Sequence, residues 1–248
     1  MLVACWSSKG GAGTTVVAAS LALLLARRDP LGALLVDLGG DVPAALGVAE
    51  PTGPGLTDWL GAGPSVPADG LPRLEVATAD GVAVIPRGTG PLVATRADAL
   101  VGLLAADARP VVVDCGTLTD EVAGAVAAAA PRSILVTRPC FLGLRRAMAA
   151  PLRPSEVVLV TEPGRSLSSV DVEDCLGAPV VAEVALDPAV ARAVDAGLLA
   201  VRLPRAGGVS HRLPALLRCC CFPFWGPPRG RLSLICRKIL PLIFCRRL

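Results

Sequence analysis

Aromatic and charged side chains are scarce in this chain of 248 residues. Tyrosine is absent and aromatic residues make up 3% of the sequence, whereas alanine, valine and leucine dominate. Such a composition favours close packing of helices on a sheet over an aromatic-lined site for a sugar or a base. Charged residues make up only 18% and hydrophobic residues 53%, a balance that argues against extensive disorder. The length allows one sizeable α/β core, so we expect one main domain.

Side chains that commonly bind transition metals are few or poorly spaced. His211 is the single histidine, so a metal or proton-relay site built on histidine has little support. The cysteines lack the spacing of a zinc site. Five of the nine lie beyond residue 218, and we expect the other four to be small core residues: Cys5, Cys115, Cys140 and Cys175.

No targeting or membrane-spanning segment is expected. The first residues run directly into a glycine-rich turn, which is unlike a secretory signal. No uninterrupted apolar run reaches the ~20 residues that a membrane-spanning helix needs. We therefore expect a cytoplasmic protein with reduced thiols.

The formal net charge of +3 is unevenly distributed along the chain. Residues 219–248 hold six of the 24 basic residues and none of the 21 acidic ones, so the remainder has 18 basic residues and a net charge of −3. An acidic body argues against specific nucleic-acid binding. A local arginine patch is the one feature that could still serve it: Arg192, Arg202, Arg205 and Arg212.

Short apolar runs alternate with stretches rich in alanine and leucine. This alternation predicts an α/β fold, with a mostly parallel central sheet flanked by helices on both faces. We expect strands at residues 2–6, 33–37, 82–86, 110–114, 133–137, 157–161 and 180–183. We expect helices at residues 15–28, 95–106, 119–129, 142–149, 170–176 and 189–196. Residues 47–81, rich in glycine and proline, are expected to form loops around one short helix at 56–60.

The composition changes abruptly after Arg218, where cysteine, phenylalanine and isoleucine rise together. We therefore expect a nucleotide-binding domain over residues 1–217 and a Cys/Arg-rich tail over 218–248 outside the fold. The tail mixes apolar residues with clustered arginine and lysine, as in a segment that lies on a membrane surface. The prolines of the tail, and a composition unlike that of the rest of the chain, agree equally well with an extension translated in a shifted reading frame. Both interpretations stay open.

A glycine-rich turn joins the first expected strand to the first expected helix. Glycines let consecutive backbone N–H groups curl around phosphate oxygens, and the helix adds its free N–H groups and positive dipole end. The Thr15 hydroxyl is placed to bind Mg²⁺ on a nucleotide. A turn without a ligand is the alternative, because Ser8 replaces the usual first glycine and Thr14 the usual lysine. The candidate phosphate-binding residues are Ser8, Lys9, Gly10, Gly11, Ala12, Gly13, Thr14 and Thr15.

Residues 9–15 (KGGAGTT) resemble the deviant phosphate loop of the ParA/MinD superfamily, which carries an extra lysine before the paired glycines. Lys9 is that lysine, and no other lysine occurs in the first 237 residues. The resemblance implies a three-layer P-loop NTPase fold, ATP and Mg²⁺ as ligands, and a nucleotide-dependent homodimer in which Lys9 reaches the partner's phosphates. Thr14 departs from the family lysine and resembles the TadZ/CpaE branch of pilus-assembly proteins. The departure is expected to weaken binding by about 1.5–3 kcal/mol.

Two of the expected strands end in an aspartate. Asp114 ends the segment VVVD, the Walker B form, and would hold Mg²⁺ through a water opposite the phosphate loop. The alternative is an aspartate that only caps the next turn. Asp37 resembles the first aspartate of the family's switch segment. The second, beside the attacking water, is Gly39 here, and Asp41 is the candidate for a displaced counterpart.

These features predict an ATP-binding molecular switch for intracellular positioning or assembly. The resemblance implies catalytic roles for Lys9, Asp37 and Asp41, a pilus or secretion apparatus as cargo, and hydrolysis that is weak or absent. A pseudo-ATPase scaffold, favoured by Thr14 and Gly39, is the second hypothesis, and a partitioning ATPase that binds DNA non-specifically is the third. We expect a cytoplasmic location, with peripheral contact at the inner membrane face if the tail binds lipid.

Residues 187–197 resemble a late segment of MinD and CpaE proteins that follows the adenine-side strand. Asp187 precedes a proline and could equally be the N-cap of a helix. The helix cap is the preferred interpretation.

Overall fold

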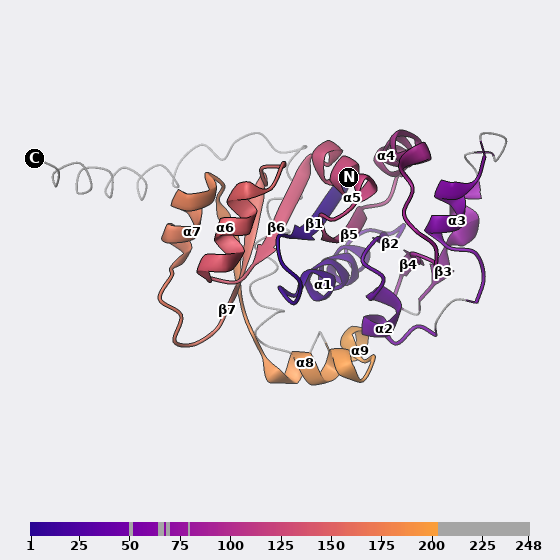
Figure 1. Cartoon of the computed structure of the whole chain (residues 1–248). Coiled ribbons are helices and arrows are strands. Elements are labelled where there is room, and N and C mark those ends of the chain that lie inside the picture. The colour runs from indigo at the N-terminus through magenta and orange to yellow at the C-terminus, as the bar shows by residue number, and fades with distance from the viewer. Residues whose placement is uncertain (50–51, 64–66, 68–69, 79, 203–248) are drawn as a thin grey trace, which may run out of the picture. The chain divides into compact units, whose positions relative to one another are not determined.

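The computed structural model describes residues 1–49, 52–63, 67, 70–78 and 80–202. The described residues form one eight-stranded sheet with helices on both of its faces (Figure 1). Its strands are β1 (Leu2–Ser7), β2 (Ala33–Asp37), β3 (Val76–Ala77), β4 (Val82–Ile85), β5 (Val111–Thr117), β6 (Arg132–Thr137), β7 (Glu156–Thr161) and β8 (Val180–Ala185). Their order in the sheet is β3-β4-β2-β5-β1-β6-β7-β8. All neighbours are parallel except β3 and β4.

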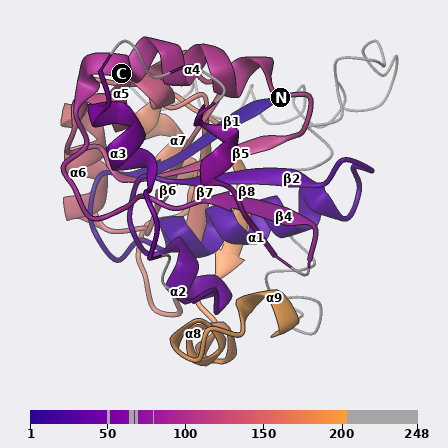
Figure 2. The same cartoon turned by 90° about the vertical axis from the view of Figure 1, so that its right-hand side faces the viewer.

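The helices form two layers, one on each face of the sheet. The described helices are α1 (Thr14–Ala26), α2 (Val42–Leu46), α3 (Leu56–Gly61), α4 (Ala97–Ala106), α5 (Glu121–Ala129), α6 (Phe141–Ala149), α7 (Ser169–Leu176), α8 (Pro188–Asp195) and α9 (Leu199–Arg202). Short 3₁₀ turns lie at Pro72–Leu74 and Ala94–Arg96. Figure 2 shows α4 and α5 on one face, with α1, α2 and α8 on the other. The fold is thus the three-layer arrangement that the sequence predicts.

The central strands are apolar on both sides because helices cover both faces. Every residue of β1 and β2 is buried. The one indole in β1, Trp6, donates a hydrogen bond from Nε1 to the Ser133 hydroxyl at 3.0 Å, so its polar atom is satisfied inside the core. Leu100 of α4, Val122 of α5 and Leu144 of α6 belong to the hydrophobic cluster on one face.

The predicted strands and helices are present, with boundaries that shift by a few residues. Among the described residues, the two-residue strand β3, the short helices α2 and α9, and the 3₁₀ turn at Pro72–Leu74 were not expected. Residues 47–81 contain more structure than one short helix, since a 3₁₀ turn and β3 accompany α3. The predictions for the tail at 218–248 lie outside the described residues, as do those for Arg205, His211 and Arg212.

Helices α2 and α8 touch through two glycines that follow them. Gly47 and Gly197 have φ of 70° and 65°, in the left-handed region that favours glycine. A Cβ on Gly47 would lie 2.0 Å from the carbonyl oxygen of Gly197, so the two backbones are in direct contact. This contact brings the end of α8 to the carboxyl ends of the strands, where the glycine-rich turn between β1 and α1 lies.

In the part of the chain that the structure describes, no helix has both the length and the apolar character needed to cross a membrane.

Candidate functional site

The glycine-rich turn lies between β1 and α1, at the carboxyl end of a central strand. Gly11 and Gly13 have φ of 75° and 95°, which a side chain would strain. A Cβ on Gly10 or Gly11 would meet nothing within 4 Å, so these residues border open space. The first turn of α1 carries no acidic residue. The free N–H groups and the positive end of the α1 dipole are therefore available to an anion.

A cavity of about 650 Å³ adjoins this turn. It lies at the carboxyl ends of β1, β2 and β5, the edge where ligands bind in open α/β sheets. The glycine-rich turn and the start of α1 form one wall, and the loops after β2 and β5 form another. Its lining residues include Gly10, Gly11, Ala12, Gly13, Thr14, Thr15, Gly39, Asp41, Arg87, Gly116, Asp120 and Asp195.

Asp114 lies beside this cavity in β5 and is fully buried. Its Oδ1 accepts a hydrogen bond from the Gly116 amide at 3.0 Å, whereas its Oδ2 has no hydrogen-bond partner among the described residues. Burial raises the pKa of Asp114, and the Thr15 hydroxyl and the Gly116 amide oppose that rise. The Thr15 hydroxyl thus lowers the pKa of Asp114, yet Oδ2 of Asp114 has no hydrogen-bond partner among the described residues. A buried oxygen left unpaired is costly, so this position suits a cation or its bound water.

The residues present fit a magnesium ion bound together with a polyphosphate. Mg²⁺ typically takes one or two carboxylates and completes its shell with waters and phosphate oxygens. Thr15 and Asp114 would hold the ion from α1 and β5, as the sequence predicts. No group of three or more His, Cys, Asp or Glu side chains in the described ranges is arranged as an all-protein metal site.

Gly39 packs directly against Asp114. A Cβ on Gly39 would lie 3.3 Å from Oδ2 of Asp114 and 3.6 Å from the Cα of Gly116. Gly116 itself has a φ of 56°, and the two loops meet backbone to backbone. A side chain at position 39 would therefore require the Asp114 carboxylate to shift by a few tenths of an ångström. The close contact gives a local reason for glycine at position 39.

Asp37 is fully buried and holds the loop that follows β2. Its Oδ1 accepts from the Gly40 amide at 2.6 Å and its Oδ2 accepts from the Val42 amide at 3.1 Å. Burial raises the pKa of Asp37 to about 7, with smaller upward contributions from Asp114 and Asp41. Asp37 does not line the large cavity, but borders a smaller one of about 70 Å³ beside the loop after β4. Its carboxylate positions the Gly39–Gly40 turn.

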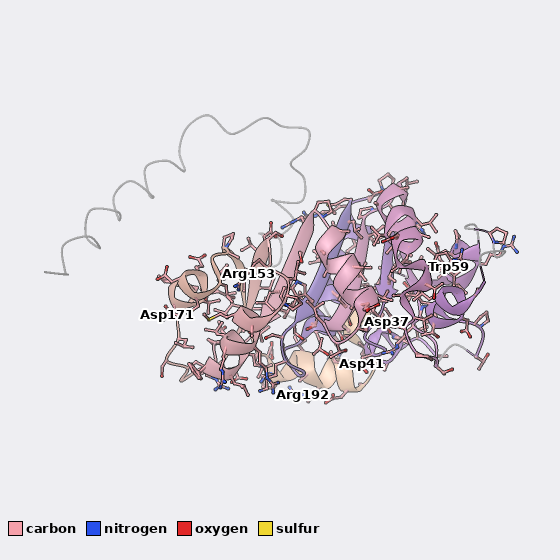
Figure 3. All side chains as sticks on the ribbon, turned by 45° about the horizontal axis from the view of Figure 1, so that its top comes forward. Asp37, Asp41, Trp59, Arg153, Asp171 and Arg192 are labelled. Atoms are coloured by element: carbon pink, nitrogen blue, oxygen red, sulfur yellow. The ribbon has the colours of Figure 1, made fainter. Side chains whose placement is uncertain are left out.

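Asp41 is exposed and lines the large cavity. Figure 3 shows Asp41 near Asp37, at the end of β2 where the chain enters α2. Of the two aspartates of this loop, Asp41 is thus the one whose side chain is accessible to a ligand in the cavity. Its predicted catalytic role stays a prediction.

Lys9 and Ser8 lie on the other side of the glycine-rich turn. Lys9 is exposed and lines a separate depression of about 300 Å³ together with Arg138, Cys140 and Gly143. The Ser8 hydroxyl donates to the Gly143 carbonyl at 2.9 Å, which ties the loop to α6. Neither residue lines the large cavity of its own chain. Gly10, Gly11 and Ala12 line both spaces, whereas Gly13, Thr14 and Thr15 line only the large cavity. Ser8 and Lys9 therefore lie on the opposite side of the turn from Thr14 and Thr15.

Three charged residues of the cavity were missed by the sequence analysis: Arg87, Asp120 and Asp195. Asp120 is the N-cap of α5, where its Oδ1 accepts from the Ala123 amide at 2.8 Å. Arg87 and Asp120 each lie shortly after a predicted strand, a position that could have marked them. Asp195 lies at the end of α8, and only the α2–α8 contact brings it to the cavity. Asp187 is the N-cap of α8 and accepts from the Ala189 amide at 2.7 Å, as the preferred interpretation holds.

Solved structures of ParA and MinD proteins share this fold. The ParA family ATPase from Chlorobium tepidum TLS matches with a TM-score of 0.72 at 22% identity, over 87% of this chain and 98% of that chain. MinD from Pyrococcus horikoshii OT3, complexed with Mg-ADP, matches with a TM-score of 0.72 at 21% identity, over 88% of this chain and 95% of that chain. A variant of McdA from Cyanothece in complex with ATP gives a TM-score of 0.62 at 17% identity, over 87% of this chain and 95% of that chain.

No family model and no curated protein sequence matches the chain. The structural likeness confirms the predicted fold class, a P-loop NTPase fold with a mostly parallel sheet between two helical layers. The fold is the one found in ParA and MinD ATPases.

Proposed function

We propose that this chain is an ATP-binding molecular switch of the ParA/MinD kind that acts in intracellular positioning or assembly. One observation carries the proposal. A cavity of about 650 Å³ has the phosphate loop and Thr15 on one wall, and beside it lies a buried carboxylate oxygen of Asp114 without a partner among the described residues. A polyphosphate would accept hydrogen bonds from the backbone N–H groups of the turn, and its magnesium ion would bind near the unpaired oxygen of Asp114.

Backbone groups supply most of the binding in this site. The turn at Gly10–Gly13 and the first residues of α1 donate N–H groups to phosphate oxygens. Thr15 and Asp114 hold Mg²⁺, which offsets the charge of the phosphates. Asp37 keeps the loop after β2 in place through its two amide contacts. This loop is the element whose position would differ between nucleotide states.

A nucleotide-dependent homodimer is part of the proposal. Lys9 is exposed and lies outside its own chain's large cavity, which leaves its ammonium group available to a second copy. An ammonium is a strong partner for a phosphate once the interface excludes water. Light scattering with and without ATP measures the molecular mass and so tests this role. A Lys9→Ala variant should remain monomeric in the presence of ATP. If that variant still forms dimers with ATP, Lys9 is not required for dimerisation.

Weak or absent hydrolysis follows from two positions. Thr14 supplies no charge to the phosphates, and Gly39 supplies no carboxylate beside the attacking water. Asp41 is the accessible carboxylate of the loop and the candidate to replace it. Turnover of the wild type and of Asp41→Ala tests this point, because equal rates would remove Asp41 from the chemistry.

The Gly-Thr-Thr sequence at 13–15 supports placement near the TadZ/CpaE branch, with a pilus or secretion apparatus as cargo. A pseudo-ATPase scaffold is the second candidate function. Thr14 and Gly39 favour it, because neither supplies the charged group that stands at that point in most of the ParA/MinD superfamily.

Nucleotide titration separates the switch from the scaffold. We expect the full-length chain to bind ATP and ADP, more tightly with Mg²⁺ than with EDTA. A Thr15→Ala variant should lose most of the Mg²⁺ effect because the hydroxyl ligand is gone. Thr95→Ala provides the matched control, because Thr95 is exposed and does not line the cavity. No detectable binding of either nucleotide at millimolar concentration would exclude the switch and leave the scaffold.

The proposed location is the cytoplasm. Peripheral contact with a membrane through residues 218–248 is a separate part of the proposal. Sedimentation with anionic liposomes, with and without those residues, tests it. Binding that depends on the tail and weakens with salt supports peripheral attachment.

A further inference from the structure

The large cavity is short of positive charge for a site that takes a polyphosphate. Of the described residues that line it, four are charged: Asp41, Asp120, Asp195 and Arg87. Three carboxylates would repel phosphate oxygens at the few-ångström distances of a bound ligand. Thr14 supplies no charge, and Lys9 lies in the separate depression. Arg87 is therefore the sole cation among the described lining residues.

The backbone of Arg87 is held firmly in place. Arg87 follows β4, and the start of α3 binds this segment: the Leu56 amide donates to the Pro86 carbonyl at 2.9 Å and the Thr57 amide to the Arg87 carbonyl at 2.8 Å. Next to it, Gly88 touches Gly55 so closely that a Cβ on Gly55 would lie 2.5 Å from Gly88. The Arg87 side chain thus extends from a backbone segment that is held in place by hydrogen bonds and close packing.

The Arg87 side chain extends across the turn that follows β2. Its Cδ lies 3.5 Å from where a Cβ on Gly40 would be, and its Nη1 donates to the Leu38 carbonyl at 3.3 Å. This single long hydrogen bond leaves most of the five guanidinium N–H donors unused. No carboxylate in the described part of the chain forms a salt bridge with Arg87. A half-buried guanidinium with unused donors at the wall of a cavity suits an anionic ligand.

The strand order decides which part of a nucleotide Arg87 can meet. Two strands, β5 and β2, lie between the phosphate-loop strand β1 and the Arg87 strand β4. Three strand spacings amount to about 14 Å. Because the loop and the start of α1 cradle the inner phosphates, only the far end of an extended triphosphate approaches the opposite wall.

We propose that Arg87 binds the terminal phosphate of a nucleoside triphosphate from within the same chain, replacing the charge that Thr14 lacks and favouring triphosphate over diphosphate. The inference rests on the proposed nucleotide-binding function and adds the residue that distinguishes the two ligands. Through its hydrogen bond to Leu38, the same guanidinium also links the terminal phosphate to the turn after β2.

The test compares two ligands in the full-length chain, a non-hydrolysable ATP analogue and ADP, both with Mg²⁺. Arg87→Gln should weaken binding of the ATP analogue by about ten- to a hundredfold, the effect of one charge-assisted contact, and binding of ADP by less than about threefold. Arg87→Lys should lose less than Arg87→Gln, because the ammonium keeps the charge but not the forked geometry. The ratio of the two affinities is the readout, since it does not depend on a general loss of stability.

Arg153→Gln is the matched control. Arg153 is exposed and lies before β7, at the amino ends of the strands, so the same loss of charge occurs away from the cavity (Figure 3). This variant should bind both ligands as the wild type does. An Arg87→Gln variant that binds both as the wild type does, or loses both equally, would overturn the role of Arg87 while the nucleotide site stands. A wild-type chain that binds neither ligand would remove the proposed function and this inference together.

Discussion

Asp37 and Asp114 occupy paired positions on the neighbouring parallel strands β2 and β5. Both carboxyl groups are fully buried, and they differ in how they are satisfied. Asp37 accepts two backbone amides, whereas Asp114 keeps one oxygen without a partner among the described residues. The two carboxyl groups thus differ: Asp37 holds the adjacent loop, whereas Asp114 has a buried oxygen with no partner among the described residues.

Stability should depend on pH through Asp37. Its pKa rises from 3.8 to about 7 on folding, so between these values the folded chain holds a proton that the unfolded chain has released. The stabilising effect of that proton is complete below pH 3.8 and is lost as the pH rises through 7. The loss is at most on the order of 4 kcal/mol. Urea unfolding of the ligand-free chain at pH 5 to 8 should show the wild type losing stability relative to Asp37→Asn. If the free energies of unfolding of the two proteins change in parallel with pH, the raised pKa of Asp37 is contradicted.

Adding the missing charge should tighten nucleotide binding. Thr14 is buried against the cavity at the start of α1, where a lysine would reach the phosphates. Thr14→Lys is expected to raise ATP affinity by about ten- to a hundredfold through one charge-assisted contact. Ala149→Lys adds the same charge at the exposed end of α6 and should leave the affinity unchanged. Calorimetric titration measures both, and an equal gain in the two variants would show only a general effect of charge.

Removing the charge of Asp114 should remove the effect of Mg²⁺. Asp114→Asn keeps an oxygen for the Gly116 amide but replaces the carboxylate that would hold the ion. We expect ATP affinity to become nearly equal in Mg²⁺ and EDTA, whereas the wild type binds at least about tenfold more tightly with the ion. Asp174→Asn, an exposed change on α7, serves as control. A full Mg²⁺ effect in Asp114→Asn would assign the ion to other ligands.

The contact between α2 and α8 should not tolerate a methyl group. A Cβ on Gly47 would lie 2.0 Å from the Gly197 carbonyl oxygen, and its φ of 70° strains any side chain. We expect Gly47→Ala to lower the free energy of unfolding by about 2–4 kcal/mol. Gly102→Ala, in α4 with nothing within 4 Å of the new Cβ, should be neutral or stabilising by up to about 1 kcal/mol. Chemical denaturation measures the free energy of unfolding of both variants. Equal stability of the two variants would mean that the backbones at Gly47 and Gly197 can move apart at little cost.

Much of the fold could be predicted because its signals are local. Continuous apolar runs mark β1, β2 and β5, and alanine- and leucine-rich stretches mark the helices between them. The elements that were missed have weak local signals. β3 is two residues long and pairs only at the sheet edge, and α2 has Pro43 in its first turn. Their presence depends on neighbours that are distant in the sequence.

The candidate site was predicted in part for the same reason. The positive φ of Gly11 and Gly13 and the free N–H groups of α1 are consequences of a short segment, and the sequence alone indicates them. Asp195 carries no such signal, and Arg87 carries only its position directly after a predicted strand. They line the cavity because β4 lies beside β2 and because α8 packs on α2.

The sequence by itself determined the alternation of strands and helices, the glycine-rich turn between the first strand and the first helix, and the aspartates that end two central strands. These depend on residue periodicity and on backbone freedom at glycine, which act over a few residues. Only the tertiary structure decided which side chains face the large cavity: Asp41 and Arg87 do, whereas Asp37 is used by backbone amides and Lys9 lies across the loop. The physical reason is that the direction of a side chain depends on contacts between strands and loops that are far apart in the chain.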